Sequence, residues 1–457
     1  MYRRVKKLHF VGIGGIGMSG IAEVLLNLGY KVSGSDLKET GVTRRLAQLG
    51  AQVYYGHHSD NLGQAQAVVY STAVKPDNPE LVAARERLIP VVSRGEMLAE
   101  LMRMKFGIAV AGSHGKTTTT SLITSILAYG GLDPTAVIGG RVKALASNAK
   151  LGQSEYLVCE ADESDGSFLR LSPRIVVVTN VNAEHLDHYK DMSRLQATFR
   201  QFLDLIPFYG LAALCWDNPG VREIAKGYSR RYTTYGLSGD ARLRAENVQP
   251  DGFQVNFLAL LDGRELGRIR LPLPGLHNVL NCLAALAVAL ELEIPFPIVS
   301  EAMERFAGVE RRFQVKGKRD GITIVDDYGH HPEEIKATLS AARSCHSGRL
   351  VVLFQPHRFS RLQALFPEFL DAFKEADLLM ITDVYPAGEQ PIAEVNSAKL
   401  YGEIKKKGHP EVSYHPNNAE LLEAAWRVLR PQDMVMTLGA GDIGRVADQL
   451  AGRLGAR

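Results

Sequence analysis

Short apolar runs alternate with helical patterns along nearly the whole chain. Most runs hold five or six residues rich in Val, Ile and Leu, and a turn and a helix-like stretch usually follow. This pattern is typical of strands that helices cover on both faces. The predicted strands are 8–12, 31–35, 67–71, 107–111, 156–160, 175–180, 321–326, 350–355, 378–382 and 434–438. We therefore predict an α/β protein whose sheets are mostly parallel.

Three of these strands open into glycine-rich turns, at Gly12, Gly112 and Gly439. Three such turns predict three units of the nucleotide-binding type. At about 150 residues per domain, the chain length also favours three domains. We place them at 1–105, 106–313 and 314–457, the first and last Rossmann-like. Within the second, residues 232–273 alternate like antiparallel strands, which predicts a small antiparallel sheet beside the main one.

Charge and cysteine content narrow the class of protein. The chain has 53 Lys and Arg against 50 Asp and Glu, so nothing favours nucleic acid or an anionic membrane as partner. Its four cysteines show no C-x-x-C spacing, which argues against disulfides or zinc and favours a reducing compartment. No run approaches the ~20 apolar residues of a membrane span, and the N-terminus lacks an A-x-A cleavage site. We expect a cytoplasmic protein.

The first glycine turn, VGIGGIG at 11–17, has the G-x-G-x-x-G spacing at Gly12, Gly14 and Gly17. It follows a predicted strand and precedes a predicted helix, so backbone amides at the helix start can approach a diphosphate. Asp36, at the end of the next strand, is a candidate acceptor for ribose hydroxyls. The pattern alone leaves open a NAD loop and a turn that only lets the helix pack.

The second turn, AVAGSHGKTTTT at 109–120, carries the strongest signal. Its G-K-T core is typical of a phosphate loop, in which Lys116 neutralises the β- and γ-phosphates and the Thr117 hydroxyl reaches Mg²⁺. The usual longer spacing would require a glycine where Val110 stands, so the loop is short; a chance match at a helix start is the alternative. We predict a central P-loop-type ATPase domain. Its ATP-binding residues are Gly112, Ser113, His114, Gly115, Lys116, Thr117 and Thr118.

A magnesium–ATP site also needs oxygen ligands, because Mg²⁺ is a hard cation. Glu160 closes one predicted strand, in EADESD, and His185 follows the next, in NAEHLDHY. Their placement after successive strands favours metal ligation by Thr117, Glu160 and His185. The neighbouring Asp162, Glu163, Asp187 and His188 are equally well explained as solvated or structural residues.

Taken in order, AGSHGKTTT, EADESD and TNVNAEHLDHY resemble the Mur ligase family. The resemblance continues through PGLHNVLNCLAA, GVERRFQ, DDYGHHPEE and QPHRFSR, and so covers nearly the whole chain. It implies an ATP-dependent, amide-forming enzyme of peptidoglycan synthesis. GIGGIGMSGIA, DDYGHHP and QPHRFSR look most like the member that joins L-alanine to UDP-N-acetylmuramate. The alternatives are a ligase that recycles murein tripeptide onto the same sugar nucleotide, a P-loop NTPase that couples hydrolysis to binding or motion, and a Rossmann oxidoreductase.

The resemblance assigns ligands to the predicted sites. It implies that the first loop binds the UDP end of the sugar nucleotide, and that two asparagines, spaced i, i+3 on one helix, meet adenine; a polar helix cap is the alternative for these two. Of the neighbouring Arg311 and Arg312, an ordinary surface pair otherwise, we expect Arg312 to bind phosphate. The UDP-sugar residues are Gly12, Gly14, Gly15, Gly17, Ser35, Asp36, Ser71 and Thr72, and the additional ATP residues are Asn278, Asn281 and Arg312.

The third domain is implied to present the amino acid. Its residues Tyr328, His330, His331, His357, Arg358 and Arg361, with Asp327, crowd two predicted strand ends. A salt-bridged structural cluster remains the alternative for some of them. The Gly439 turn, with Gly441 and Gly444, is interpreted as domain architecture without a ligand.

The implied reaction passes through an acyl phosphate on the lactyl carboxylate, which the amine of L-alanine then attacks. The catalytic candidates are Lys116, His185, Arg312, His330 and His357, the two last for positioning or deprotonating the amine. Several sibling ligases carry a carbamylated lysine about fourteen residues after the metal histidine, where this chain has Phe199. The alanine-adding member is expected to lack it. We expect ATP and two Mg²⁺ ions per site as cofactors, and a monomer or homodimer.

Overall fold

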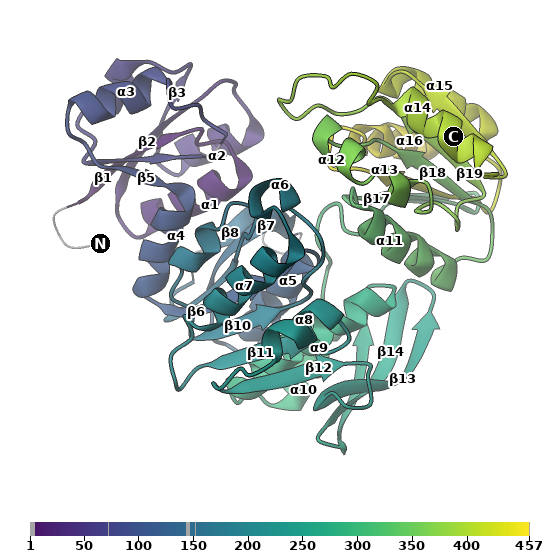
Figure 1. The fold of residues 1–457 in the computed structure, drawn as a ribbon, viewed down its shortest axis with the longest axis horizontal. Coiled ribbons are helices and arrows are strands. Elements are labelled where there is room, and N and C mark those ends of the chain that lie inside the picture. Colours follow the sequence, from purple (N-terminus) through teal and green to yellow (C-terminus); the bar gives the residue numbers. More distant parts are fainter. Residues whose placement is uncertain (1–4, 72, 143–146, 151, 457) are drawn as a thin grey trace. The chain divides into compact units, whose positions relative to one another are not determined.

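A computed structural model describes residues 5–71, 73–142, 147–150 and 152–456. The chain divides into two compact units, and each is described by itself. The first holds most of residues 1–307, and the second holds 308–457 with the segments 248–256 and 270–279. Three separate sheets, of five, ten and six strands, run through these units in chain order (Figure 1). Thr72, one of the predicted UDP-sugar residues, lies outside the described residues.

The first sheet is parallel, in the order β3-β2-β1-β4-β5. Its strands are β1 (Lys7–Val11), β2 (Lys31–Asp36), β3 (Gln52–Tyr55), β4 (Ala67–Tyr70) and β5 (Val91–Ser93). Its helices are α1 (Ile16–Asn27), α2 (Gly41–Gln48), the 3₁₀ turn η1 (Ser59–Leu62), α3 (Pro79–Glu86) and α4 (Arg94–Arg103). The strand order reverses between β1 and β4, so a crevice for a ligand is expected at the carboxyl end of β1, where the first glycine turn lies.

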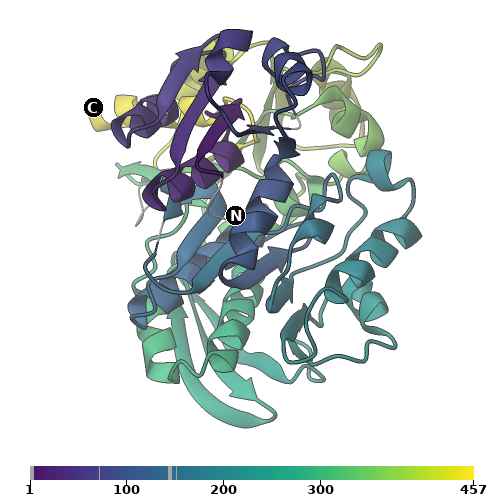
Figure 2. The same cartoon turned by 90° about the vertical axis from the view of Figure 1, so that its left-hand side faces the viewer.

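The second sheet has the order β15-β14-β13-β12-β11-β10-β6-β9-β7-β8. Its core strands are β6 (Phe106–Ala111), β9 (Tyr156–Glu160), β10 (Ile175–Val178) and β11 (Leu211–Cys215), all parallel. Every residue of β10 and β11 is buried, which requires cover on both faces, and helices lie on either side of these strands (Figures 1 and 2). The other elements of this part are β7 (Thr135–Val142), β8 (Ser147–Lys150), β12 (Tyr232–Gly236), α5 (Lys116–Tyr129), η3 (Ser167–Arg170), α6 (Leu186–Tyr189), α7 (Met192–Leu203), α8 (Pro219–Ala225), α9 (Leu276–Glu291) and α10 (Phe296–Glu304).

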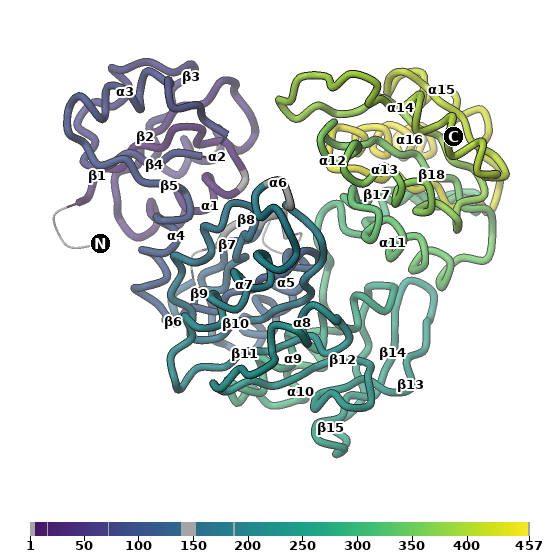
Figure 3. The backbone as a smooth tube through the Cα atoms, in the orientation of Figure 1, coloured from purple at the N-terminus to yellow at the C-terminus, as the bar shows by residue number. Residues whose placement is uncertain are grey.

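The predicted antiparallel strands extend the central sheet and do not form a sheet of their own. β13 (Leu243–Asp251) pairs parallel with β12, and β14 (Gln254–Leu261) and β15 (Arg264–Leu271) follow it through two-residue turns. Figure 3 traces the chain through these turns at one end of the sheet. The alternating pattern was therefore interpreted correctly as antiparallel hairpins. Their attachment to β12 is a long-range contact that the pattern does not contain.

The third sheet has the order β16-β17-β21-β18-β19-β20, and only β16 runs antiparallel to its neighbour. Its strands are β16 (Gln314–Arg319), β17 (Ile322–Asp327), β18 (Leu350–Phe354), β19 (Leu378–Thr382), β20 (Val412–His415) and β21 (Met434–Leu438). The helices are α11 (Pro332–Cys345), α12 (Phe359–Ala364), α13 (Phe366–Phe369), α14 (Ser397–Lys406), α15 (Asn418–Val428) and α16 (Gly444–Ala456). The predicted α/β class with mostly parallel sheets is confirmed. No helix in the described part of the chain is both long and apolar enough to span a membrane.

Candidate active site

The second glycine turn joins β6 to α5 and is held from behind by the end of β10. Gly112 has a φ of +130°, and a Cβ there would overlap the hydroxyl of Thr179. The backbone N–H of His114 donates to Oδ1 of Asn180 at 2.8 Å, and Thr179 Oγ1 donates to the His114 carbonyl at 2.6 Å. These contacts fix the turn without using the first amides of α5. No side chain caps that helix start, which therefore presents free N–H groups and a positive dipole end to an anion.

Lys116, the first residue of α5, points back over this turn. Its Nζ donates to the Gly112 carbonyl at 2.5 Å and to both carboxylate oxygens of Glu163 at 2.9 Å. Burial disfavours the ammonium, but Glu163 and then Asp162 raise the pKa of Lys116 above its ordinary value. Burial in turn raises the pKa of the Glu163 carboxyl, although Lys116 opposes that shift. The lysine is therefore a permanent cation at the start of α5.

Glu163, Glu184 and His185 bring three potential metal ligands within 4.8 Å of one another. His185 Nε2 lies 3.8 Å from Glu163 Oε1 and 4.0 Å from Glu184 Oε2. His185 has a φ of +56°, a costly conformation for a histidine that packing around it must hold in place. Two carboxylates and one imidazole suit a divalent cation, and their place beside the phosphate loop suits Mg²⁺ that also binds phosphate oxygens. The donor set thus fits the implied metal.

Glu160, the predicted metal ligand, closes β9 beside the same loop. It pairs in register with Val110, two residues before the turn begins. Thr117 is nearly buried in the first turn of α5. The three residues predicted on metal thus sit at one edge of the central sheet. The tight carboxylate–histidine group consists of Glu163, Glu184 and His185. Metal binding by Thr117, Glu160 and His185 remains a prediction.

The two predicted adenine-binding asparagines are both buried on α9. Oδ1 of Asn281 accepts from the Thr119 hydroxyl at 3.1 Å and lies beside Gly115 of the phosphate loop. The side-chain amide of Asn278 donates to the Pro274 carbonyl at 2.7 Å. Asn281 therefore supports the loop, and Asn278 fixes the entry of its own helix. Contact of either with adenine remains a prediction.

The first glycine turn follows β1 and is shaped by the end of β2. The amides of Gly12 and Ile13 donate to the Ser35 carbonyl at 2.9 and 3.0 Å, and the Gly14 amide donates to Oδ2 of Asp36 at 2.8 Å. Gly15 then caps α1 without a side-chain hydrogen bond, which leaves an exposed helix start. Asp36 thus also shapes the loop.

The hydroxyl of Ser35 faces inward and donates to the Glu80 carboxylate at 2.5 Å. Glu80 is fully buried and also accepts from the side chain of Asn61 at 2.6 Å. Burial opposes its charge, but hydrogen bonds from His9, Ser35 and Asn61 lower the pKa of Glu80 to about 2. The Ser35 hydroxyl is thus used inside the fold, and the Ser35 carbonyl supports the glycine turn. Contact of Ser35 with the UDP-sugar remains a prediction. Ser71, at the end of β4, accepts from the Ala73 amide.

In the second unit, the two adjacent arginines have different environments. Arg311 donates to Asp326 at 3.0 Å and to the carbonyls of Gly439 and Gly441 at 2.6 and 3.0 Å, so its guanidinium is used within the fold. Arg312 lies over the Tyr328 ring at 5.3 Å and forms no ion pair among the described residues. This difference supports the choice of Arg312 as the phosphate-binding arginine.

The residues predicted to present the amino acid gather at the carboxyl ends of β17 and β18. The His330 ring lies edge-on to Tyr328 and His357, at 5.5 and 5.7 Å, and His357 stacks on Tyr385 at 5.6 Å. Burial, with Arg361 and Arg358 nearby, lowers the pKa of His357 to about 4, and burial lowers that of His330 to about 3. Both imidazoles are therefore neutral at pH 7.

Other members of that group have structural contacts. Nδ1 of His331 accepts from the Glu333 amide at 3.3 Å and caps α11, so its predicted contact with the amino acid competes with a helix-capping role. Arg361 lies 3.2 Å from Nδ1 of His357. Arg358 has a φ of +68°, and its N–H donates to the Tyr385 carbonyl at 2.9 Å. Asp327 accepts from the Phe313 and Gly329 amides at 2.7 and 2.8 Å, which ties it to the loop backbone.

Several residues of the site were not found from the sequence. Thr179, Asn180 and Glu184 contact or adjoin the phosphate loop, and Tyr385 stacks on His357. The available signal was the polar run TNVNAE directly after an apolar strand, which places side chains at the carboxyl edge of a parallel sheet. Tyr385 had no signal, because it enters from the loop after β19.

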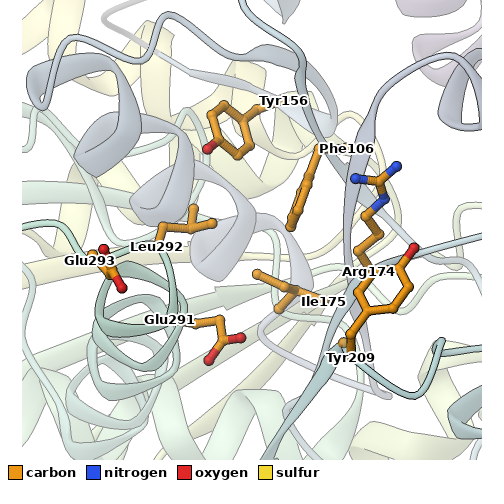
Figure 4. A pocket seen from close by; sticks show the side chains of 9 residues that line it. Phe106, Tyr156, Arg174, Ile175, Tyr209, Glu291, Leu292 and Glu293 are labelled. Atoms are coloured by element: carbon orange, nitrogen blue, oxygen red, sulfur yellow. The ribbon is translucent and has the colours of Figure 1, made fainter.

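A cavity of about 300 Å³ lies at the opposite edge of the central sheet, near the amino ends of its strands. Figure 4 shows Phe106, Tyr156 and Arg174 around it, with Glu291 and Glu293 on the facing helix end. The guanidinium of Arg174 stacks on Phe106 at 5.0 Å. None of the predicted site residues lines this cavity, so the glycine turns and not this pocket define the candidate site.

Comparison with known proteins gives the chain a family along its whole length. Three family models match successive segments: "Mur ligase family, catalytic domain" over 7–106, "Mur ligase middle domain" over 110–289 and "Mur ligase, glutamate ligase domain" over 311–441. The chain is 55% identical over 454 residues to UDP-N-acetylmuramate–L-alanine ligase of Geotalea uraniireducens, covering 99% of each chain.

Solved structures agree in fold. The UDP-N-acetylmuramate–alanine ligase of Thermotoga maritima matches with a TM-score of 0.83 and 29% identity, over 98% of this chain and 99% of that one. MurF ligase of Thermotoga maritima, solved in complex with ADP, matches with a TM-score of 0.66 over 93% and 96% of the two chains; at 17% identity it shows the fold alone. The ATP-type loop, the domain order and the full-length matches together show that the chain belongs to the Mur ligase family.

Proposed function

We propose that this protein joins L-alanine to the lactyl carboxylate of UDP-N-acetylmuramate with consumption of ATP, in the synthesis of the peptidoglycan precursor. One observation carries the proposal: a phosphate loop beside a carboxylate–histidine group occurs in a chain 55% identical to alanine-adding ligases over its whole length. We assign binding of the sugar nucleotide to segment 1–105, binding of ATP to segment 106–313 and presentation of L-alanine to segment 314–457. These segments follow the three sheets.

The central segment supplies the positive groups that allow the triphosphate and the lactyl carboxylate, which are both anions, to approach each other. Free amides at the start of α5 and the ammonium of Lys116 receive the triphosphate, and Arg312 adds a second cation for the transferred phosphoryl group. Mg²⁺ would be held by Thr117, Glu160 and His185 with Glu163 and Glu184, and its charge would screen phosphate oxygens from the incoming carboxylate. The γ-phosphoryl group passes to the lactyl carboxylate, giving an acyl phosphate and ADP.

The third segment supplies the amine. The α-amine of L-alanine must be neutral to attack the acyl carbon. The C–O bond to phosphate then breaks, the nitrogen gives up one proton to the leaving phosphate, and an amide bond remains. His330 and His357, neutral at pH 7, can accept a hydrogen bond from that amine and aim its lone pair. Their pKa values of about 3 and 4 make them weak bases, which favours positioning over deprotonation. Arg358 or Arg361 suits the alanine carboxylate.

The test is phosphate release from ATP and Mg²⁺ with UDP-N-acetylmuramate and a panel of acceptors: L-alanine, glycine, L-serine and the murein tripeptide. We expect release only when sugar nucleotide and amino acid are both present, fastest with L-alanine. Preference for the tripeptide would instead assign the recycling reaction. Release without sugar nucleotide would indicate a P-loop NTPase and refute the proposal.

A further inference from the structure

Arg94, the first residue of α4, lies between the first glycine turn and the acidic loop after β9. A Cβ placed on Gly17, in the first turn of α1, would be 3.0 Å from both Cδ and Nη1 of Arg94. The other end of the guanidinium donates from Nη2 to Oδ2 of Asp162 at 3.0 Å. One planar group thus meets the start of α1 on one side and a carboxylate on the other.

The positive charge of Arg94 lies beside the positive end of a helix dipole. The start of α1 carries a partial positive charge, Gly15 is exposed there, and no side chain caps it. A cation beside that pole is unfavourable alone. Asp162 pairs with one end of the guanidinium only, at 3.0 Å, and the other end lies beside the start of α1. The arrangement becomes favourable when an anion binds both the helix start and the guanidinium.

We infer that Arg94 binds the diphosphate of the sugar nucleotide and that Asp162 is the carboxylate with which the diphosphate competes for the guanidinium. The inference rests on the proposed function, which places a UDP-sugar at this turn. A guanidinium offers paired donors that match two phosphate oxygens. It also gives the third glycine of the G-x-G-x-x-G pattern a reason: a Cβ on Gly17 would press against the Arg94 side chain and force it to shift.

The first experiment compares two ligands that differ only in phosphate. Arg94→Met is titrated with UDP and with uridine, and binding is followed by NMR. Loss of a charge-assisted contact should weaken UDP binding roughly 10- to 100-fold. Uridine should bind as to wild type, which shows that the base and ribose site is intact. The matched control is Arg103→Met, on the same helix but exposed and paired with Glu100, and it should leave both ligands unaffected.

Two further variants separate ligand binding from structural support. Arg94→Lys keeps the positive charge but lacks the paired donors of the guanidinium, so its UDP affinity should fall less than that of Arg94→Met. This variant replaces Arg94→Met in the test if Arg94→Met does not fold. Asp162→Asn removes the competing carboxylate, so UDP should bind as tightly as to wild type or more tightly. Wild-type UDP affinity in Arg94→Met overturns the inference. So does an Asp162→Asn variant weakened as much as Arg94→Met, because the pair would then only tie two segments together.

These outcomes are distinct from failure of the proposed function. A wild-type protein that bound neither UDP nor UDP-N-acetylmuramate would overturn both. A wild-type protein that binds UDP tightly, beside an Arg94→Met variant that binds it equally well, overturns the role of Arg94 alone.

Discussion

Replacing Lys116 tests two contributions of this residue, one to the free energy of unfolding and one to turnover. Its ammonium is paired with Glu163, whose side chain is only 1% exposed, at 2.9 Å. Removing one partner of a buried ion pair typically costs about 3–5 kcal/mol, because the other charge stays buried. Glu163 can escape part of this cost by taking up a proton, since burial already raises its pKa. We therefore expect Lys116→Met to lose about 2–3 kcal/mol of unfolding free energy at pH 7.

The sign of the pH dependence follows from that raised pKa. A carboxyl whose folded-state pKa exceeds its unfolded value of about 4.3 adds stability at low pH, and that stability is lost as the pH rises through the folded value. The thermal unfolding midpoint of Lys116→Met should therefore lie further below wild type at pH 8 than at pH 5. The double variant Lys116→Met/Glu163→Gln removes the buried charge and should recover most of the loss at pH 8.

Turnover should not recover with stability. Without the ammonium the transferred phosphoryl group loses a preorganised cation, an effect of about 3–4 kcal/mol or roughly 10²- to 10³-fold in kcat. Phosphate release measures this, and calorimetry should show UDP-N-acetylmuramate binding nearly unchanged. Lys105→Met is the control, since that partly buried lysine bonds the Ser154 carbonyl away from the loop. Wild-type-like turnover in Lys116→Met, or turnover regained in the double variant, would refute the reasoning.

Three further predictions test other parts of the site. Arg312→Lys should lower kcat at least tenfold with little change in Tm, whereas Arg311→Lys should lower Tm because it breaks contacts within the fold; equal Tm losses would contradict this. Gly112→Ala should abolish ATP binding measured by calorimetry, because its φ of +130° and the Thr179 hydroxyl exclude a Cβ; retained binding would show that the turn can adapt. Glu80→Gln should cost about 3 kcal/mol at pH 7, from a pKa lowered to about 2. Urea unfolding should show that difference shrinking as the pH falls from about 4 towards 2, and a constant difference would contradict the ionised carboxylate.

The local part of the site was predictable because it is local in sequence. The turns at Gly12 and Gly112 each follow an apolar strand and precede a helix, and strand, turn and helix are all visible in one stretch of residues. The choice of Lys116 needed no tertiary information, because G-K-T at a helix start has one common use. The predicted strands agree with the structure for the same reason, to within a residue or two.

The remaining parts depend on which strands become neighbours. Glu163 reaches Lys116 because β9 lies beside β6, although 47 residues separate them in sequence. Ser35 stood at a strand end suited to a ligand, yet the burial of Glu80 on α3 turned its hydroxyl inward. In the sequence, His330 and His331 look equivalent. The structure distinguishes them, because His331 caps the start of α11. Sequence spacing does not encode such pairings.

The third glycine turn shows why a shared pattern does not imply a shared ligand. At the first two turns the helix start is uncapped, so amides and dipole are available to an anion. At the third, the guanidinium of Arg311 binds the carbonyls of Gly439 and Gly441, and Asp442 accepts from Gln355 at 2.8 Å. The third turn therefore uses two of its carbonyls as hydrogen-bond acceptors for Arg311, and the positive charge of that guanidinium is already paired with Asp326. We therefore expect the same strand–turn–helix unit to receive a substrate at the first two turns, whereas at the third it anchors Arg311, the arginine next to Arg312.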